Sequence, residues 1–233
     1  MRLTLDTTFD NADLPLIDPT VPLLRASTIE IFDMLSADGA TGALSMDFAG
    51  TFGAQGAIAT ATTPLNTNII EQDNMTLIFC WKIDRVTGTQ HMGMGNLSPA
   101  AAPFTGFRLA TAANNTPTMI VASGVTSPSN YSLSSVGYSQ AWTVQTIQIS
   151  NTLIKRISHA GAEVSAAVTT RAKSTLPIYL NGLPDAFDAS LKTGAPGTIG
   201  MFCAYSEILA TADCVTLMDA IAAIMADRGV TVP

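Results

Sequence analysis

Charged residues are scarce in this chain of 233 residues: they make up 12% of it, whereas 47% is hydrophobic. Soluble domains usually carry about a quarter charged residues, so the surface must be built largely from Ser, Thr, Asn, Gly and Ala. Basic residues number 11 against 18 acidic ones, and they form no cluster. This excludes the basic footprint that binds nucleic acid. It favours a protein packed against neighbours in an assembly, or an extracellular one.

The chain is also poor in the residues that metal and nucleophile chemistry needs. Its two histidines, His91 and His159, belong to no zinc-binding pattern. No Gly-x-Ser-x-Gly elbow, P-loop or Gly-x-Gly-x-x-Gly motif occurs. Its three cysteines, Cys80, Cys203 and Cys214, are widely spaced and odd in number. We therefore expect three buried thiols in a protein made in a reducing cytoplasm.

No long apolar run is present either. The first six residues turn polar at once and lack the apolar stretch of a signal peptide. The longest apolar helical segment, 217–226, is too short to span a bilayer and contains Asp219. The sequence predicts a protein made in a host cytoplasm without a signal peptide and without membrane insertion, as a virion component would be.

The chain does have many short segments of strand type, separated by turn residues. In 75–83 every odd position is apolar, and Ile78 and Cys80 make the other face apolar too, so this strand should be central. We expect a bulge or a strand bend near Thr146, where the apolar phase slips, and a Ser/Gly-rich loop between residues 123 and 140. Further strands are predicted at 28–32, 43–46, 56–59, 91–97, 106–111, 118–123, 141–150 and 152–158.

The last quarter of the chain predicts two strands and a closing helix. By the two-residue strand period, one face of the second strand carries Ile199, Met201, Cys203 and Tyr205. The helix should begin with Thr211 as N-cap and end before Gly229. Its apolar stripe consists of Leu217, Met218, Ile221, Ile224 and Met225.

This C-terminal stretch resembles the end of concanavalin A-like domains of the laminin G type. The matching segments are 178–182, 197–200, 205–209 and, after the helix, 228–230. The resemblance implies an all-β fold: a two-sheet antiparallel jelly-roll sandwich of the concanavalin A-like kind, with a short C-terminal helix. Such domains recur in bacteriophage virion proteins and in secreted adhesins, lectins and glycanases, so the resemblance leaves the function open.

Two regions are expected along the chain. Residues 1–29 carry Pro15, Pro19 and Pro22, which prevent a helix and favour an extended N-terminal arm. The arm either lies along the domain as an irregular edge or docks on a neighbouring subunit. Residues 30–233 should form one sandwich domain that includes the helix, because the sequence shows no internal repeat and no linker.

Glycoside hydrolysis is an activity that this fold can host, and it needs two carboxylates that flank the scissile bond. The segment 30–33 superficially resembles the Glu-x-Asp-x-x-Glu motif of laminarinase-like enzymes, but its spacing is wrong and no second glutamate follows. We therefore predict that the chain is not an enzyme, although distant carboxylates could still meet in space. The chain has four glutamates: Glu30, Glu71, Glu163 and Glu207.

Two loops carry the candidate binding residues. Sugars are bound by exposed aromatic rings and by amides, and the Ser/Gly-rich loop offers Asn130, Tyr131 and Tyr138. Calcium, the one cofactor considered, needs several oxygen ligands, and the loop after residue 180 offers Asn181, Asp185 and Asp188. A plain turn would have the same composition, because Asp and Asn stabilise turns through their own backbone.

The leading hypothesis is a non-enzymatic structural or adhesion module of a bacteriophage virion, in its tail, fibre, baseplate or capsid decoration. Its partners would be other virion proteins, further copies in a homo-oligomer, and a cell-surface glycan. The alternatives are a stand-alone lectin-like carbohydrate-binding protein and a glycoside hydrolase with an unrecognised carboxylate pair.

Overall fold

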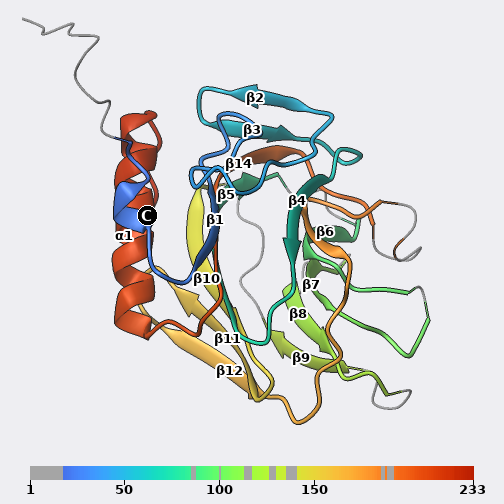
Figure 1. Ribbon diagram of the computed structural model, residues 1–233. Helices are drawn as coiled ribbons and strands as arrows, with labels where there is room; N and C mark the ends of the chain where they lie inside the picture. Colours follow the sequence, from blue (N-terminus) through green and yellow to red (C-terminus); the bar gives the residue numbers. More distant parts are fainter. Residues whose placement is uncertain are drawn as a thin grey trace, which may run out of the picture.

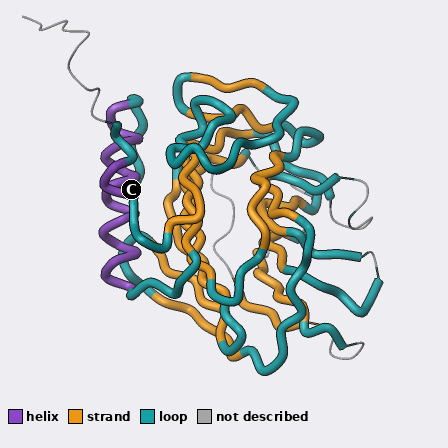
Figure 2. The backbone as a smooth tube through the Cα atoms, viewed as in Figure 1, coloured by secondary structure: helices purple, strands orange, loops and turns teal. Residues whose placement is uncertain are grey.

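The computed structural model describes residues 18–84, 88–99, 101–112, 117–125, 130–134, 141–184, 187 and 192–233, with residues 130, 131 and 134 described by their backbone alone. Two antiparallel sheets pack face to face (Figure 1), and Figure 2 shows them as two layers of strands with a helix outside one of them. The predicted all-β jelly-roll sandwich with a C-terminal helix is confirmed.

The larger sheet has eight strands in the order β12-β11-β10-β5-β14-β3-β2, with β1 also beside β14. One edge of β14 pairs with β5, while its other edge pairs first with β3 and then with β1. The strands are β1 (Thr28–Phe32), β2 (Thr51–Gly53), β3 (Gly56–Ala59), β5 (Met75–Ile83), β10 (Thr143–Ile149), β11 (Leu153–Ser158), β12 (Glu163–Ala167) and β14 (Gly197–Tyr205).

The smaller sheet has six strands in the order β4-β13-β6-β7-β8-β9. Its inner side packs against the larger sheet and completes the main hydrophobic core. The strands are β4 (Leu65–Ile70), β6 (His91–Gly95), β7 (Phe107–Thr111), β8 (Pro117–Ala122), β9 (Asn130–Ser134) and β13 (Pro177–Leu180).

Strand β5 is central, as its sequence predicts. Its odd positions, Phe79 and Trp81 among them, belong to the core between the sheets, whereas Ile78 and Cys80 face the helix side. The strand is apolar on both faces because both faces are covered.

The helix α1 (Thr211–Asp227) covers the outer face of the larger sheet (Figure 1), and all five residues of its predicted apolar stripe are buried. Its end is also as predicted: Gly229 has a φ of 73°, and the amides of Gly229 and Val230 donate to the carbonyls of Ala226 and Met225. The predicted N-cap is wrong by one residue, because Ala210 occupies that position and the Thr211 hydroxyl donates to Glu163 instead. No helix of the described residues has the length and apolar character needed to cross a membrane.

Two predictions about strand faces are wrong. The pairing of β14 with β5 shifts register between Ile199 and Met201, so Ile199 lies in the inter-sheet core while Met201 lies beneath the helix. Gly200 absorbs this bulge close to the Met225 side chain. Of the bulge or strand bend predicted near Thr146, the bulge does not occur, since β10 pairs with β5 and β11 in unbroken register. The apolar residues of β10 lie on both of its faces because both are covered. Val144 lies beneath the helix, whereas Ile147 and Ile149 lie in the core between the sheets.

Other segments differ from their predictions in type. Residues 130–134 form strand β9 within the predicted Ser/Gly-rich loop, and 65–70 form the unpredicted edge strand β4. The predicted strand 43–46 is reduced to an isolated bridge between Asp38 and Ser45. The apolar alternation of β4 is weak because the polar residue Thr67 occupies a buried, inward-facing position.

The end of the predicted arm lies against the domain. The short 3₁₀ helix η1 (Val21–Leu23) packs on α1, Leu23 is buried, and the Tyr205 hydroxyl donates to the Leu23 carbonyl at 2.9 Å. Residues 1–17 lie outside the described residues, so the arm and its docking on a neighbour stay predictions.

The three cysteines are free and buried, as predicted. Burial raises the pKa of the Cys80 and Cys203 thiols to about 12 and that of Cys214 to about 11. Because the reactive species is the thiolate, we expect none of them to react with a thiol reagent such as DTNB in the native protein near neutral pH. All three should react in denaturant, and titration in both states tests this. Rapid labelling of the native protein would contradict it.

Candidate functional site

Two of the four glutamates are buried, and the first of them organises a loop. Glu30 is fully buried at the centre of β1. Its Oε1 accepts the backbone amides of Ile31 at 2.9 Å and Thr41 at 3.0 Å, and its Oε2 accepts the Leu44 amide at 3.0 Å and the Thr41 hydroxyl. Glu30 therefore anchors the loop from 33 to 46 onto the sheet, and its oxygens are already engaged.

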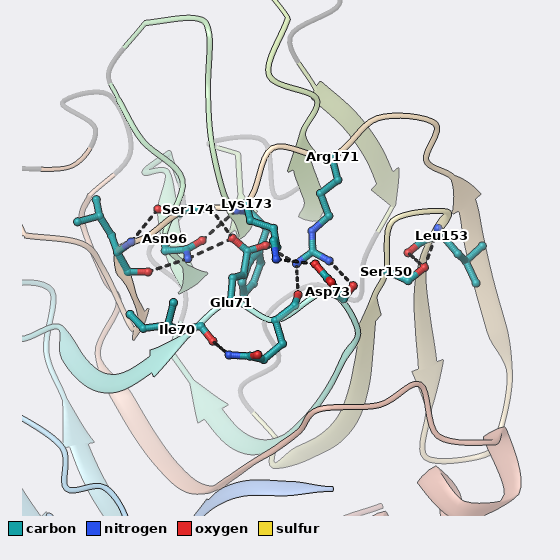
Figure 3. A network of polar contacts seen from close by, with 12 residues as sticks. Ile70, Glu71, Asp73, Asn96, Ser150, Leu153, Arg171, Lys173 and Ser174 are labelled. Atoms are coloured by element: carbon teal, nitrogen blue, oxygen red, sulfur yellow. Dashed lines mark hydrogen bonds and ion pairs between the residues drawn. The ribbon is translucent and has the colours of Figure 1, made fainter.

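Glu71 forms a buried ion pair with Arg171 (Figure 3). The two side chains are 0% exposed, and Arg171 Nη2 lies 2.6 Å from Glu71 Oε1. The other carboxylate oxygen accepts the Ser174 amide at 2.9 Å and the Asn96 side-chain amide at 3.4 Å. Arg171 also donates to the backbone carbonyl of Asp73 at 2.8 Å. This network ties the turn before β5 to the segment before β13, so its role is structural.

The remaining two glutamates lie on the surface. Glu163 pairs with Lys155 at 2.9 Å and accepts from Thr211, and these contacts, that of Thr211 first, lower the pKa of the Glu163 carboxyl. Glu207 accepts from the Ser27 hydroxyl. Each of the four glutamates thus has a partner of its own in the described structure: the Thr41 amide for Glu30, Arg171 for Glu71, Lys155 for Glu163 and Ser27 for Glu207.

The predicted calcium ligand Asn181 is buried within a turn. Its φ is 55°. Its side-chain amide nitrogen donates to the Thr60 carbonyl at 2.7 Å, and its side-chain oxygen accepts the Ala195 backbone amide at 2.8 Å. Asp185 and Asp188 lie outside the described residues. Within the described residues no group of His, Cys, Asp and Glu has the arrangement of a metal site, and calcium stays a prediction.

The predicted sugar-binding residues are only partly placed. The backbones of Asn130 and Tyr131 lie in the edge strand β9, opposite Ala122 and Val121, and not in a loop. Tyr138 lies outside the described residues. The three therefore stay a prediction.

Strand pairing builds a different surface on the outer side of the smaller sheet. Residues directly opposite in an antiparallel pair point to the same face. One lateral line of such residues, Leu65-Leu180-Met94-Leu109-Met119-Leu133, belongs entirely to the inner core. The next line must therefore face outward. This line, called here the Tyr179 row, is Asp47-Asn66-Tyr179-Gly95-Arg108-Ile120-Ser132.

Hydrogen bonds order the first end of the Tyr179 row. The exposed Asp47 carboxylate accepts from the side-chain amides of Asn66 at 3.1 Å and Asn68 at 3.3 Å through the same oxygen, Oδ2. Asn68, with a φ of 57°, also donates to the Ser45 carbonyl at 2.8 Å. The amides thus hold the Asp47 carboxylate in place beside the row.

The ring of Tyr179 packs against a small apolar cluster on the outer side of the sheet. Phe187 contacts it edge to face, with 5.1 Å between ring centroids, and is itself buried in a small cluster with Met92. Tyr179 is half-buried, and burial, followed by the negative charge of Asp47, raises the pKa of its phenol. Its hydroxyl makes no hydrogen bond to the described part of the chain. A supported aromatic ring beside ordered amides and a carboxylate is suited to stacking on a sugar and binding its hydroxyl groups.

A hollow of about 200 Å³ lies elsewhere, between β10, the end of β11 and Pro233. His159 lies at its edge, with Nδ1 at 3.0 Å from the Pro233 carbonyl and Nε2 at 3.0 Å from Asp219 Oδ1. Its walls are mostly apolar, so it is less suited to a polar ligand than the Tyr179 row.

Sequence reasoning missed this site. The alternation of Asn66 and Asn68 around a buried Thr67 is the one local signal for β4, and Tyr179 was noted only as part of the resemblance. Nothing in the sequence joins Asp47 to Tyr179.

No protein-family model and no curated protein matches this sequence. Solved structures match it in fold. The binding domain of botulinum neurotoxin serotype D has a TM-score of 0.60 at 13% identity, over 83% of this chain and 50% of that chain. Domain 4 of AbnA, an extracellular arabinanase of Geobacillus stearothermophilus, has a TM-score of 0.60 at 12% identity, over 82% of this chain and 98% of that one.

A mutant sialidase of Trypanosoma rangeli that displays trans-sialidase activity has a TM-score of 0.63 at 13% identity, over 87% of this chain and 36% of the sialidase chain. This chain therefore spans about half or less of the toxin and sialidase chains but nearly all of the arabinanase domain. At these identities the likeness is one of fold.

Proposed function

We propose that this protein is a non-enzymatic, glycan-binding module, and that it serves as a structural or adhesion part of a bacteriophage particle. The Tyr179 row is the observation that carries the proposal, because it combines a supported aromatic ring with ordered amide and carboxylate groups on an outward face. The engaged glutamates support a role without catalysis.

Several proteins with this fold have sugars as ligands. The arabinanase domain was solved with arabinotriose, and cell entry of botulinum neurotoxin type C depends on two ganglioside molecules. The particle context is supported by the low charged fraction of 12%, which suits surfaces packed against other virion proteins or against further copies of this chain. A stand-alone lectin would use the same row.

Binding to a panel of bacterial surface polysaccharides and oligosaccharides tests the proposal. We expect saturable binding that Tyr179→Ala weakens at least about tenfold, or about 1.4 kcal/mol, while Tyr179→Phe keeps most of it because the ring remains. Tyr131→Ala and Tyr138→Ala serve as controls for the rival site, and a calcium chelator tests the metal.

Three results would count against the proposal. Loss of binding in Tyr131→Ala with full binding in Tyr179→Ala would place the site at β9. Absence of binding to every glycan would leave a purely architectural role. Release of reducing ends from a bound glycan would show that the protein is an enzyme.

A further inference from the structure

The charge beside Tyr179 restricts which sugar can bind there. We infer that the sugar ring stacked on Tyr179 is uncharged, as in a neutral hexose or pentose unit, and that uronic and sialic acid units are disfavoured at this position. The inference rests on the proposed function and goes further by naming the substrate class.

The negative charge of Asp47 is not balanced by an ion pair with a cation of the described residues. Both side-chain contacts of its carboxylate are amide donors, Asn66 and Asn68, and both reach the same oxygen. No Lys or Arg of the described residues forms an ion pair with it, and the residue is exposed. A ligand hydroxyl can donate to the remaining oxygen, whereas a ligand carboxylate can only repel it.

The field of this carboxylate reaches Tyr179. After burial, the negative charge of Asp47 is the next cause that raises the pKa of the Tyr179 hydroxyl. Asn66 lies directly opposite Tyr179 in the strand pairing, and its side-chain amide donates to Asp47 Oδ2 at 3.1 Å. The Tyr179 ring and the Asp47 carboxylate therefore lie on the same outward face, so a sugar stacked on the ring meets a negative charge.

Arg108 is the cation of the Tyr179 row, and it lies on the other side of the ring. It is two strands away across Gly95, just as Asp47 is two positions away across Asn66. The Nε atom of Arg108 is buried, however, whereas Asp47 is exposed and accepts from the residue opposite Tyr179. An acidic sugar could approach Arg108 only as a neighbouring unit of an oligosaccharide, so the unit on Tyr179 itself is still expected to be neutral.

Matched ligands that differ only in charge test the inference. A neutral glycan that binds in the panel is compared with the same glycan oxidised to uronate at its primary hydroxyl groups, at low ionic strength. We expect the neutral form to bind at least about tenfold more tightly. Asp47→Asn, whose amide oxygen can still accept from Asn66 and Asn68, removes the charge that repels the uronate form and should reduce that ratio to about threefold or less. The readout is the ratio of the two affinities in each variant, and not the affinity for the neutral form alone.

Asp213→Asn is the matched control. Asp213 is exposed on α1, which covers the larger sheet on the other side of the molecule, and its substitution changes the net charge equally. It should leave the ratio unchanged. Equal or tighter binding of the uronate form, or a ratio that Asp47→Asn leaves as it was, would overturn the inference and leave the proposed function standing. If neither form of any glycan bound, the proposed function itself would fail, and the inference with it.

Discussion

Replacing Arg171 by methionine is expected to destabilise the protein by about 3–5 kcal/mol, because it leaves the Glu71 carboxylate buried without its partner. Both side chains are 0% exposed, and Arg171 also supplies a hydrogen bond to the Asp73 carbonyl. Chemical denaturation followed by tryptophan fluorescence measures the change, with the expectation of a lower midpoint at an unchanged slope.

A double substitution separates the ion pair from simple loss of packing. Glu71→Leu with Arg171→Met removes both charges, so we expect it to cost clearly less than the two single substitutions added together. Lys173→Met is the surface control, since it breaks the neighbouring but exposed pair with Asp73 and should leave the midpoint nearly unchanged. If the double substitution cost as much free energy of unfolding as the two single substitutions added together, the buried pair would act through packing and not through charge.

Replacing Glu30 by glutamine is expected to cost about 2–4 kcal/mol, because buried donors would lose their acceptor. Glu30 presents two acceptor oxygens to the amides of Ile31, Thr41 and Leu44. A glutamine has one such oxygen, and its amide group would point donor to donor at the others.

The loss should be localised in the loop that Glu30 holds. Hydrogen exchange is expected to accelerate at the amides of Thr41 and Leu44 before it does in β5. Glu207→Gln is the matched control: it changes the same charge at an exposed position and should affect neither stability nor exchange. Unchanged exchange at Thr41 and Leu44 in Glu30→Gln would show that the carboxylate does not hold the loop.

The position of Glu30 also shows why carboxylates were hard to interpret from sequence. The segment 30–33 looked like part of a glycosidase strand, yet Glu30 accepts three backbone amides. One belongs to the adjacent Ile31, and the others belong to Thr41 and Leu44, eleven and fourteen residues away. Whether a glutamate is catalytic or structural depends on what surrounds it, and its surroundings come from a folded loop that has no local signature.

The sequence by itself determined two kinds of element. One is a strand that is covered on both faces, and the other is a helix that buries one continuous apolar stripe. Strand β5 and helix α1 could be predicted because apolar residues recur there at the period of the element, and Gly229 ends the helix for a backbone reason. Their signals are strong because hydrophobic burial acts on each residue and is visible within a short window.

Only the tertiary structure decided which residues meet. The bulge at Gly200 moves Ile199 to the opposite face from Met201. Three successive strand registers, with one bridge, place Asp47, Asn66, Tyr179 and Arg108 in a single outward row. A strand's own period shows that it has two faces, but not which face meets the core or which residue lies opposite. Register is set by the packing of the core residues in the neighbouring row, and these come from distant parts of the chain.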